Sequence, residues 1–166
     1  MADKGQAAFA ALRRLCTELA RAVMDVMHAD CGVVFLPSRD MSKLEFALGL
    51  PRNTMGSKYS EGLIGIPLMA LPVAKFLLEG HSAALHRDDD IALLPGQPEV
   101  MPLLGVETIG MVASTPFTTG TDRTWSVAAS FTYPDRVDPD SSSVGTVRKL
   151  LDADAPDLFS LLQRVS

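Results

Sequence analysis

Apolar residues recur along the N-terminal segment at spacings of three and four residues. The positions are Phe9, Leu12, Cys16, Leu19, Val23 and Val26. Residues three and four apart lie above one another on a helix, so all six fall on one stripe. The pattern predicts an amphipathic helix that ends near residues 28–30.

Two pairs of β-forming runs follow. Residues 31–36 are rich in β-formers and closed by Pro37, and residues 43–48 alternate polar and apolar across the polar turn 38–42. Residues 107–117 and 125–133 form a similar pair around the turn-rich segment 118–124. Runs of this kind separated by turn residues predict two β-hairpins.

The segment between the hairpins, residues 49–90, is called the roof segment below. Prolines and glycines punctuate its first half, which predicts loops and short helices. Residues 71–79 have helical spacing between Pro72 and Gly80, and residues 82–86 suit a short strand. A further short helix is predicted around residues 100–104.

The C-terminal segment returns to helical spacing, from Val144 to Val165. Asp140 is a candidate helix cap, and the sequence Asp154-Ala155-Pro156 interrupts the pattern, because proline removes a backbone donor. One broken helix or two helices are predicted. Segregated runs of helices and strands favour an α+β fold with an antiparallel sheet.

Composition and charge narrow the classes of function. At 166 residues with 47% hydrophobic and 21% charged residues, one domain spanning residues 1–166 with a single core is expected. The net charge of −5 without a basic cluster argues against nucleic acid as a partner. No apolar run reaches the ~20 residues of a membrane span, and no secretory signal is recognised, so we expect a cytoplasmic protein.

Several stretches resemble GAF domains, a family of sensory and regulatory domains. Residues 29–36, Ala-Asp-Cys-Gly-Val-Val-Phe-Leu, look like the family's first strand after its leading helix. Residues 103–117, Leu-Leu-Gly-Val-Glu-Thr-Ile-Gly-Met-Val-Ala-Ser-Thr-Pro-Phe, resemble a later strand, and residues 125–130 the strand that follows the Gly120 turn. Residues 154–162 are similar to the closing helix.

The resemblance implies a fold and a site. The fold would be a central antiparallel sheet of five to six strands, with the terminal helices on one face and short helices and loops on the other. The site would be a small-molecule pocket between the sheet and the roof segment, and the terminal helices would pair two copies into a homodimer. The residues expected at the pocket are Phe46, Phe76, His81, His86, Met111, Ala113, Ser114 and Ser126.

Metal, haem, bilin and catalytic sites have little support in the sequence. His81 and His86 with Asp88–Asp90 contain metal-ligand types, but no ligand motif is matched and a solvated loop is the simpler interpretation. His81 or His86 as a haem ligand would need an apolar pocket around a lone imidazole, so haem binding is disfavoured. The roof segment has no cysteine for bilin attachment, and a thiol pair or hydrolase triad is missing.

The sequence therefore favours a regulatory domain over an enzyme. We expect no catalytic residue and no bound metal, and the sequence does not identify a cofactor. The alternatives are a protein-interaction and dimerisation module without a ligand, and a small GAF-type redox enzyme. Trp125 is expected to fill core, and Cys16 and Cys31 to be reduced. The sequence also predicts a homodimer built largely on the N-terminal stripe, with Leu15 and Ala22 widening its apolar surface.

Overall fold

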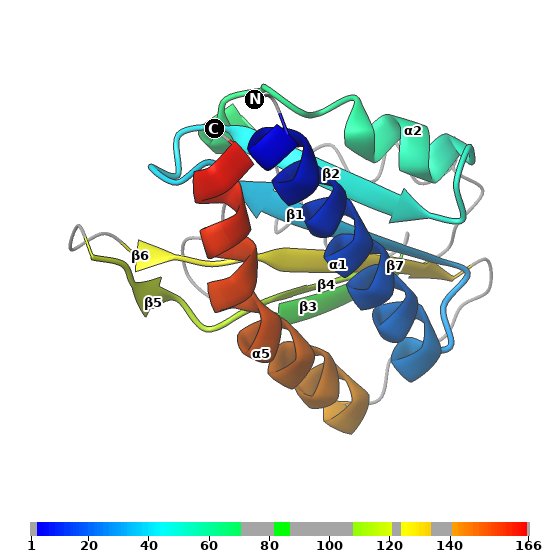
Figure 1. The fold of residues 1–166 in the computed structure, drawn as a ribbon. Helices are drawn as coiled ribbons and strands as arrows, with labels where there is room; N and C mark the ends of the chain where they lie inside the picture. Colours follow the sequence, from blue (N-terminus) through cyan, green and yellow to red (C-terminus); the bar gives the residue numbers. More distant parts are fainter. Residues whose placement is uncertain (1–2, 71–81, 87–107, 121–123, 134–140, 166) are drawn as a thin grey trace.

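A computed structural model describes residues 3–70, 82–86, 108–120, 124–133 and 141–165. Its long helices are α1 and α5, with a short helix α2 and a 3-10 turn η1 between them (Figure 1). The helical bounds are α1 Asp3–Met27, α2 Met55–Glu61, η1 Leu68–Ala70 and α5 Ser141–Val165. The strands are β1 Cys31–Pro37, β2 Leu44–Leu50, β3 Ser82–His86, β4 Thr108–Ala113, β5 Phe117–Thr118, β6 Thr124–Trp125 and β7 Ala128–Tyr133.

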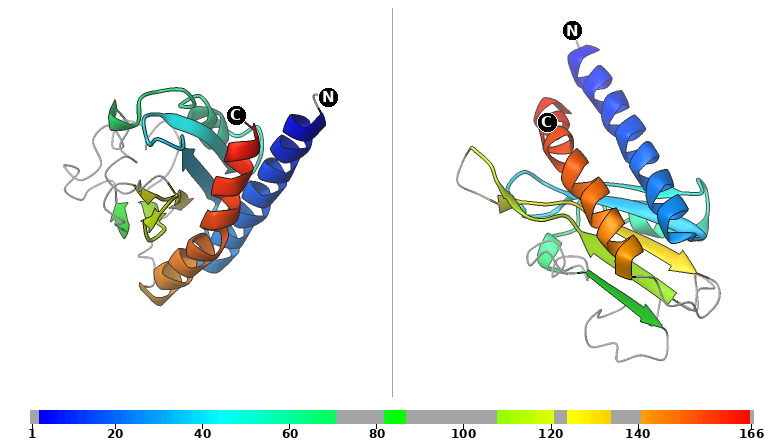
Figure 2. Two further views of the ribbon diagram at one scale, coloured as in Figure 1. Left: turned by 60° about the vertical axis from the view of Figure 1, so that its left-hand side comes forward. Right: turned by 90° about the horizontal axis from the view of Figure 1, so that it is seen from below.

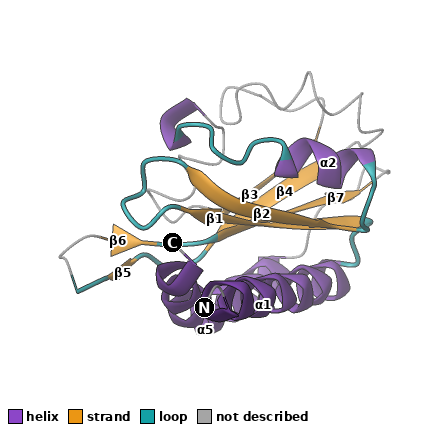
Figure 3. Ribbon diagram, turned by 45° about the horizontal axis from the view of Figure 1, so that its top comes forward, coloured by secondary structure: helices purple, strands orange, loops and turns teal. Residues whose placement is uncertain are grey.

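Among the described residues, the main sheet has five strands in the order β2-β1-β7-β4-β3, and every neighbouring pair is antiparallel. Val34 of β1 lies opposite Leu48 of β2 and Ala129 of β7. The terminal helices cover one face, and α2 lies on the other (Figures 2 and 3). The predicted α+β architecture, its strand number and both hairpins are confirmed.

The face of the sheet under α1 and α5 is called the helical face. Alternate residues of each strand point to this face, and many of them are bulky. Phe131 of β7 covers Gly110 of β4 so closely that a Cβ on Gly110 would lie 1.9 Å from the ring. The largest fully buried side chains of this core are Leu12, Leu36, Leu48, Trp125, Phe131, Leu151 and Leu158.

The opposite face is called the roof face. A smaller buried cluster lies there, formed by Val33, Phe35, Leu44, Ala47, Leu68, Met111, Ala113 and Ala128. Helix α2 sits directly on β2, since a Cβ on Gly49 would lie 2.8 Å from the Ser57 Cα. The hydroxyl of Thr54 caps α2 by accepting from the Ser57 N–H at 3.2 Å. Helix α2 thus fixes the first part of the roof segment at the β2 edge of the sheet, whereas β3 lies at the opposite edge.

The N-terminal stripe belongs mainly to the molecule's own core. Leu12, Cys16, Leu19 and Val23 are at most 2% exposed and pack against the sheet and α5. Phe9, in contrast, is 41% exposed and touches Phe46 edge-on, with ring centroids 6.0 Å apart. The central residues of the stripe are therefore covered by the molecule's own sheet and by α5, while the homodimer stays a prediction.

The C-terminal segment is one continuous helix, which corrects the predicted break at Pro156. Pro156 is exposed, while Ala155 and Leu158 on either side are buried in the helical core. Burial of these neighbours holds the backbone helical where propensity alone favours a break. Tertiary packing therefore overrides the local signal.

Three further predictions concern segments outside the described residues. These are the helix at residues 71–79, the short helix at residues 100–104 and the cap at Asp140. The short strand at residues 82–86 is confirmed as β3, and α1 ends at Met27 as predicted.

Candidate functional site

The roof face of β7 is made of small and polar side chains. Ser130 and Thr132 alternate with Phe131 and Tyr133, so they lie on the same face as Ala128. Both are 8% exposed. The central strand thus places its large residues toward the helices and its small residues toward the roof segment.

The roof face of β7 and β4 is called the floor of the candidate site. Met111 and Ala113 of β4 lie on this floor, beside β7, and both belong to the roof-face cluster. Met111 is directly opposite Ser130, and Ala113 is opposite Ala128. The sequence-based site therefore includes two residues of the floor. It missed Ser130 and Thr132, although the small-large alternation of residues 128–133 is visible in the sequence.

Phe46 lies on the other side of the sheet. It belongs to the helical core and is 6% exposed, with its ring edge-on to Phe9 of α1. The structure therefore does not bring Phe46 together with Met111 and Ala113. Phe46 shares the helical face with Leu48 and Leu50 by regular alternation. The register shift between the Leu36 and Pro37 pairings lies beyond Phe46 and places Leu44 on the roof face.

Ser114 follows the last residue of β4, and Ser126 lies shortly before β7. Both serines are fully buried. Ser114 donates its N–H to the Val127 carbonyl at 2.8 Å, and its hydroxyl accepts from the Val127 N–H at 2.9 Å. These bonds tie the two strand ends together. Ser114 thus has a clear structural role, whatever else it contacts.

Three predicted site residues, Phe76, His81 and His86, belong to the roof segment. Phe76 and His81 lie outside the described residues, as do Asp88–Asp90, and of His86 only its backbone position in β3 is described. Within the described part of the chain, no group of three or more histidine, cysteine, aspartate or glutamate side chains could hold a metal ion.

The β1–β2 turn is stiffened by a compact hydrogen-bond network. The Ser42 and Ser38 hydroxyls donate to the Asp40 carboxylate at 2.6 and 2.7 Å, and the Ser42 N–H donates to it at 3.1 Å. These bonds lower the pKa of Asp40 to about 2. The carboxylate is therefore ionised at neutral pH, where it accepts these three hydrogen bonds.

The same turn holds the roof segment. The Leu68 N–H donates to the Ser42 carbonyl at 2.9 Å, and the Leu44 N–H donates to the Ile66 carbonyl at 3.0 Å. The Gly65 N–H donates back to the Leu44 carbonyl at 2.8 Å. Residues 65–68 thus pair with the start of β2 much as a short strand would.

Trp125 joins this turn to the C-terminal helix. Its indole N–H donates to the carbonyls of Pro37 and Ser38, each at 3.2 Å. Its ring packs edge-on against Phe159 of α5, at a centroid distance of 5.2 Å, and against Phe117 of β5 at 6.0 Å. Trp125 is fully buried, which confirms the expectation that it fills core.

Both cysteines are free thiols. Burial, and to a lesser degree the nearby Asp154 carboxylate, raises the pKa of Cys16 to about 12. Burial also raises the pKa of Cys31, against the opposing effect of a hydrogen bond with Thr132. Both groups are therefore protonated near neutral pH, and a protonated thiol is a poor nucleophile.

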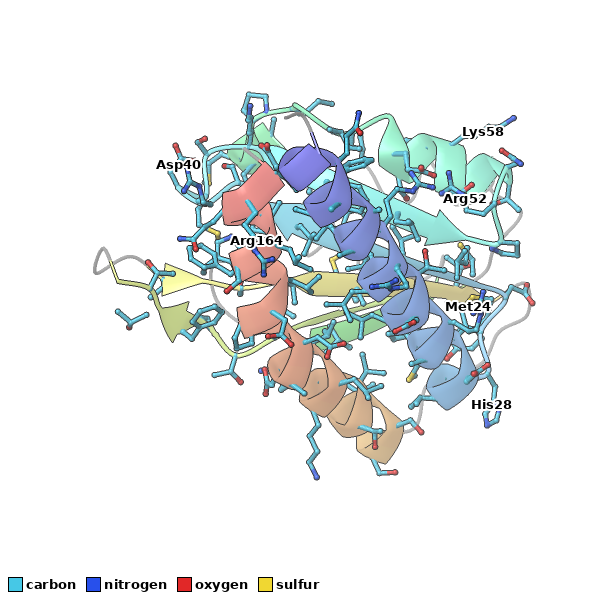
Figure 4. All side chains as sticks on the ribbon, in the orientation of Figure 1. Met24, His28, Asp40, Arg52, Lys58 and Arg164 are labelled. Carbon is cyan, nitrogen blue, oxygen red and sulfur yellow. The ribbon has the colours of Figure 1, made fainter. Side chains whose placement is uncertain are left out.

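A groove of about 350 Å³ runs between the outer sides of α1 and α5. Its lining combines a narrow apolar base with charged walls: Ala11, Arg14, Leu15, Glu18, Asp157, Ser160, Leu161 and Arg164. Figure 4 shows Arg164 on α5, on the outward side of the two helices. No described helix is long and apolar enough to span a membrane.

The fold matches solved GAF domains over nearly the whole chain. The GAF domain of a two-component sensor histidine kinase from Bacillus halodurans superposes with a TM-score of 0.66 at 13% identity, over 93% of this chain and 97% of that one. The second GAF domain of DevS from Mycobacterium smegmatis gives 0.57 at 14% identity, over 93% and 99%. A phycoerythrobilin-bound GAF domain from a cyanobacterial phytochrome gives 0.52 at 11% identity, over 98% and 94%.

No family model matches the sequence, and no curated protein matches it. The superpositions on solved structures show that the chain has the GAF fold, which confirms the expected resemblance at the level of structure. At these identities the likeness defines the fold, and the site must be argued from this chain's own residues.

Proposed function

We propose that this chain is a non-enzymatic regulatory domain that binds a small molecule between the roof face and the roof segment. Binding would alter the terminal helices within a homodimer. The observation that supports this function most directly is the asymmetry of β7, which has Phe131 and Tyr133 on the helical face but Ser130 and Thr132 on the roof face. Small side chains at the centre of a sheet leave room for a ligand, and hydroxyls can orient it.

The solved structures support a binding role at this fold. One similar structure is a phycoerythrobilin-bound GAF domain, and another comes from a sensor histidine kinase. The protonated state of both cysteines argues against thiol catalysis, so the redox-enzyme alternative is disfavoured. Free thiols also suit a reducing compartment, and we include a cytoplasmic location in the proposal.

A matched pair of substitutions on β7 tests the floor. Ser130→Leu would place a large side chain on the roof face, and Ala129→Leu would place one in the filled helical core. Overpacking a filled core costs ~1–3 kcal/mol, whereas growth into free space costs less. We expect Ala129→Leu to lower the free energy of unfolding by at least ~1 kcal/mol more than Ser130→Leu. Equal losses would contradict a free volume above Ser130.

Ligand binding is tested by thermal unfolding with cyclic GMP, cyclic AMP, biliverdin and haemin as separate probes. A ligand at 100 times its dissociation constant stabilises the fold by ~2.7 kcal/mol, which raises Tm by roughly 5–10 °C at this size. A shift seen with the native chain and lost in Ser130→Leu supports the site. A shift that persists in Ser130→Leu would place the ligand elsewhere.

One observation favours the alternative, a protein-interaction module without a ligand. Tyr59, Ile64 and Met69 of the roof segment are large apolar residues exposed by 41, 43 and 78%. Exposed apolar side chains gathered in one segment can mark a contact surface for another protein. If the chain is a protein-interaction module, none of the four small-molecule probes should change its Tm.

A further inference from the structure

The large apolar side chains that the described residues expose lie at one edge of the main sheet. Tyr59 belongs to α2, Ile64 follows α2, and Met69 belongs to η1. Phe9 of α1 reaches the same edge, because its ring packs against Phe46 of the edge strand β2. Figure 1 shows α2 and the N-terminal end of α1 on the β2 side of the sheet. The exposed side chains of Phe9, Tyr59, Ile64 and Met69 are called the edge surface below.

The backbone that carries most of the edge surface is fixed to β2. The Gly65 N–H donates to the Leu44 carbonyl, and the Leu68 N–H donates to the Ser42 carbonyl. Leu68 is fully buried in the roof-face cluster, whereas the next residue, Met69, is 78% exposed. The chain is therefore held in place by one side chain while it presents the other to solvent. A surface that is already ordered loses little conformational entropy when a partner binds.

The charges near the edge surface differ in balance from those of the whole chain. Residues 39–69 carry four basic and three acidic side chains, although the chain has a net charge of −5. Two of these carboxylates are engaged, because Asp40 accepts from serine hydroxyls and Glu61 pairs with Arg52 at 2.8 Å. Lys58 is exposed and pairs with no described acidic residue, and Figure 4 shows it projecting from α2.

A second lysine lies beside η1. Lys43 forms an isolated β-bridge with Pro67, two residues before Met69. Its ammonium group is 3.8 Å from the Glu45 carboxylate, and a solvent-exposed pair at this separation contributes little. The roof-segment part of the edge surface is therefore flanked by Lys58 at one end and by Lys43 at the other. An apolar strip between two available cations is complementary to apolar residues flanked by carboxylates.

We propose that the edge surface docks an acidic, amphipathic segment of a partner protein. Apolar side chains of that segment would cover Ile64 and Met69, and its carboxylates would face Lys43 and Lys58. Anionic lipid offers similar chemistry, but the negative charge of the chain as a whole opposes its approach. The edge surface does not include the floor of the candidate site, so this proposal holds whether or not a small molecule binds at the roof face.

Two synthetic peptides of about 14 residues test the proposal by fluorescence anisotropy. Both have leucines at helical spacing, and one carries glutamates where the other carries lysines. We expect the acidic peptide to bind the native chain with a Kd of about 10–100 µM and the basic peptide to bind at least about tenfold more weakly. Raising sodium chloride from about 50 to about 500 mM should weaken binding of the acidic peptide about tenfold, because salt screens exposed charges.

Variants of the edge surface locate the binding. The double variant Ile64→Ser, Met69→Ser removes apolar contacts at exposed positions, so the fold should persist while the Kd rises at least about tenfold. Lys58→Glu should weaken binding of the acidic peptide about threefold to tenfold and strengthen binding of the basic one. Lys149→Glu makes the same charge change at an exposed position of α5 and should stay within about twofold of the native Kd. Circular dichroism checks the folding of each variant.

The outcomes are distinct. The proposal is overturned if the acidic peptide fails to bind at about 1 mM, if both peptides bind equally, or if the double variant binds as tightly as the native chain. Vesicles of phosphatidylcholine with about one fifth phosphatidylserine form the other arm. Retention of the native chain on these vesicles, lost in the double variant, would assign the edge surface to a membrane instead. Failure of every small-molecule probe at the roof face would leave these expectations unchanged.

Discussion

Replacing Trp125 by phenylalanine removes the one indole donor that links the β1–β2 turn to the ring cluster on α5. The indole N–H bridges the Pro37 and Ser38 carbonyls, and the side chain is fully buried. Loss of a buried hydrogen bond costs ~1 kcal/mol, and the smaller ring leaves a partly filled space that costs about as much again. We expect Trp125→Phe to lower the free energy of unfolding by ~2 kcal/mol.

Urea denaturation followed by circular dichroism measures this loss without relying on tryptophan emission. Trp125→Ala should cost more, ~3–5 kcal/mol, because the whole side chain is removed from the core. Tyr59→Ala is the matched control, since Tyr59 is an aromatic residue that is 41% exposed, and it should cost under ~1 kcal/mol. A Trp125→Phe value within about 0.5 kcal/mol of the native chain would refute the assigned role of the bridging donor.

Three further predictions concern α5. The pKa of Asp154 is raised by burial and then by Asp157 and Glu18, so its ionisation opposes folding. The contribution of Asp154 to the free energy of unfolding should therefore fall as pH rises from its unfolded to its folded pKa. Asp154→Asn should therefore be more stable than the native chain at pH 7, with the advantage lost below about pH 4, as urea titrations at several pH values would show. Pro156→Ala should raise the free energy of unfolding by ~1–3 kcal/mol, because it restores a helical N–H at an exposed position. Unchanged stability would show that the helix is already relaxed around the proline. Asp152→Ala should cost ~1 kcal/mol in the same assay, because the carboxylate accepts from the Thr115 N–H at 2.7 Å and the Thr115 hydroxyl at 3.2 Å.

The local patterns of the sequence determined the elements and their order. The three-and-four spacing of the N-terminal residues predicted α1, and β-forming runs bounded by turn residues predicted both hairpins. These signals are local, because helix and strand periods follow from backbone geometry. They were sufficient for the α+β class and for the resemblance to GAF domains.

The assignment of residues to faces and partners was decided by tertiary structure. Helical spacing showed that Leu12 and Leu19 share a stripe but not whether a sheet or a second copy covers it, and the structure shows that the sheet does. The continuity of α5 across Pro156 depended on the burial of its neighbours, which no local propensity contains.

The candidate site divides in the same way. The alternation of residues 128–133 was readable in the sequence, but which of its two faces points to the roof segment required the packing of α1 and α5. Phe46 alternates regularly with Leu48 and Leu50, and the packing of α1 on that side places it on the helical face, away from Met111 and Ala113. The charged groove exists only because two helices distant in sequence lie side by side.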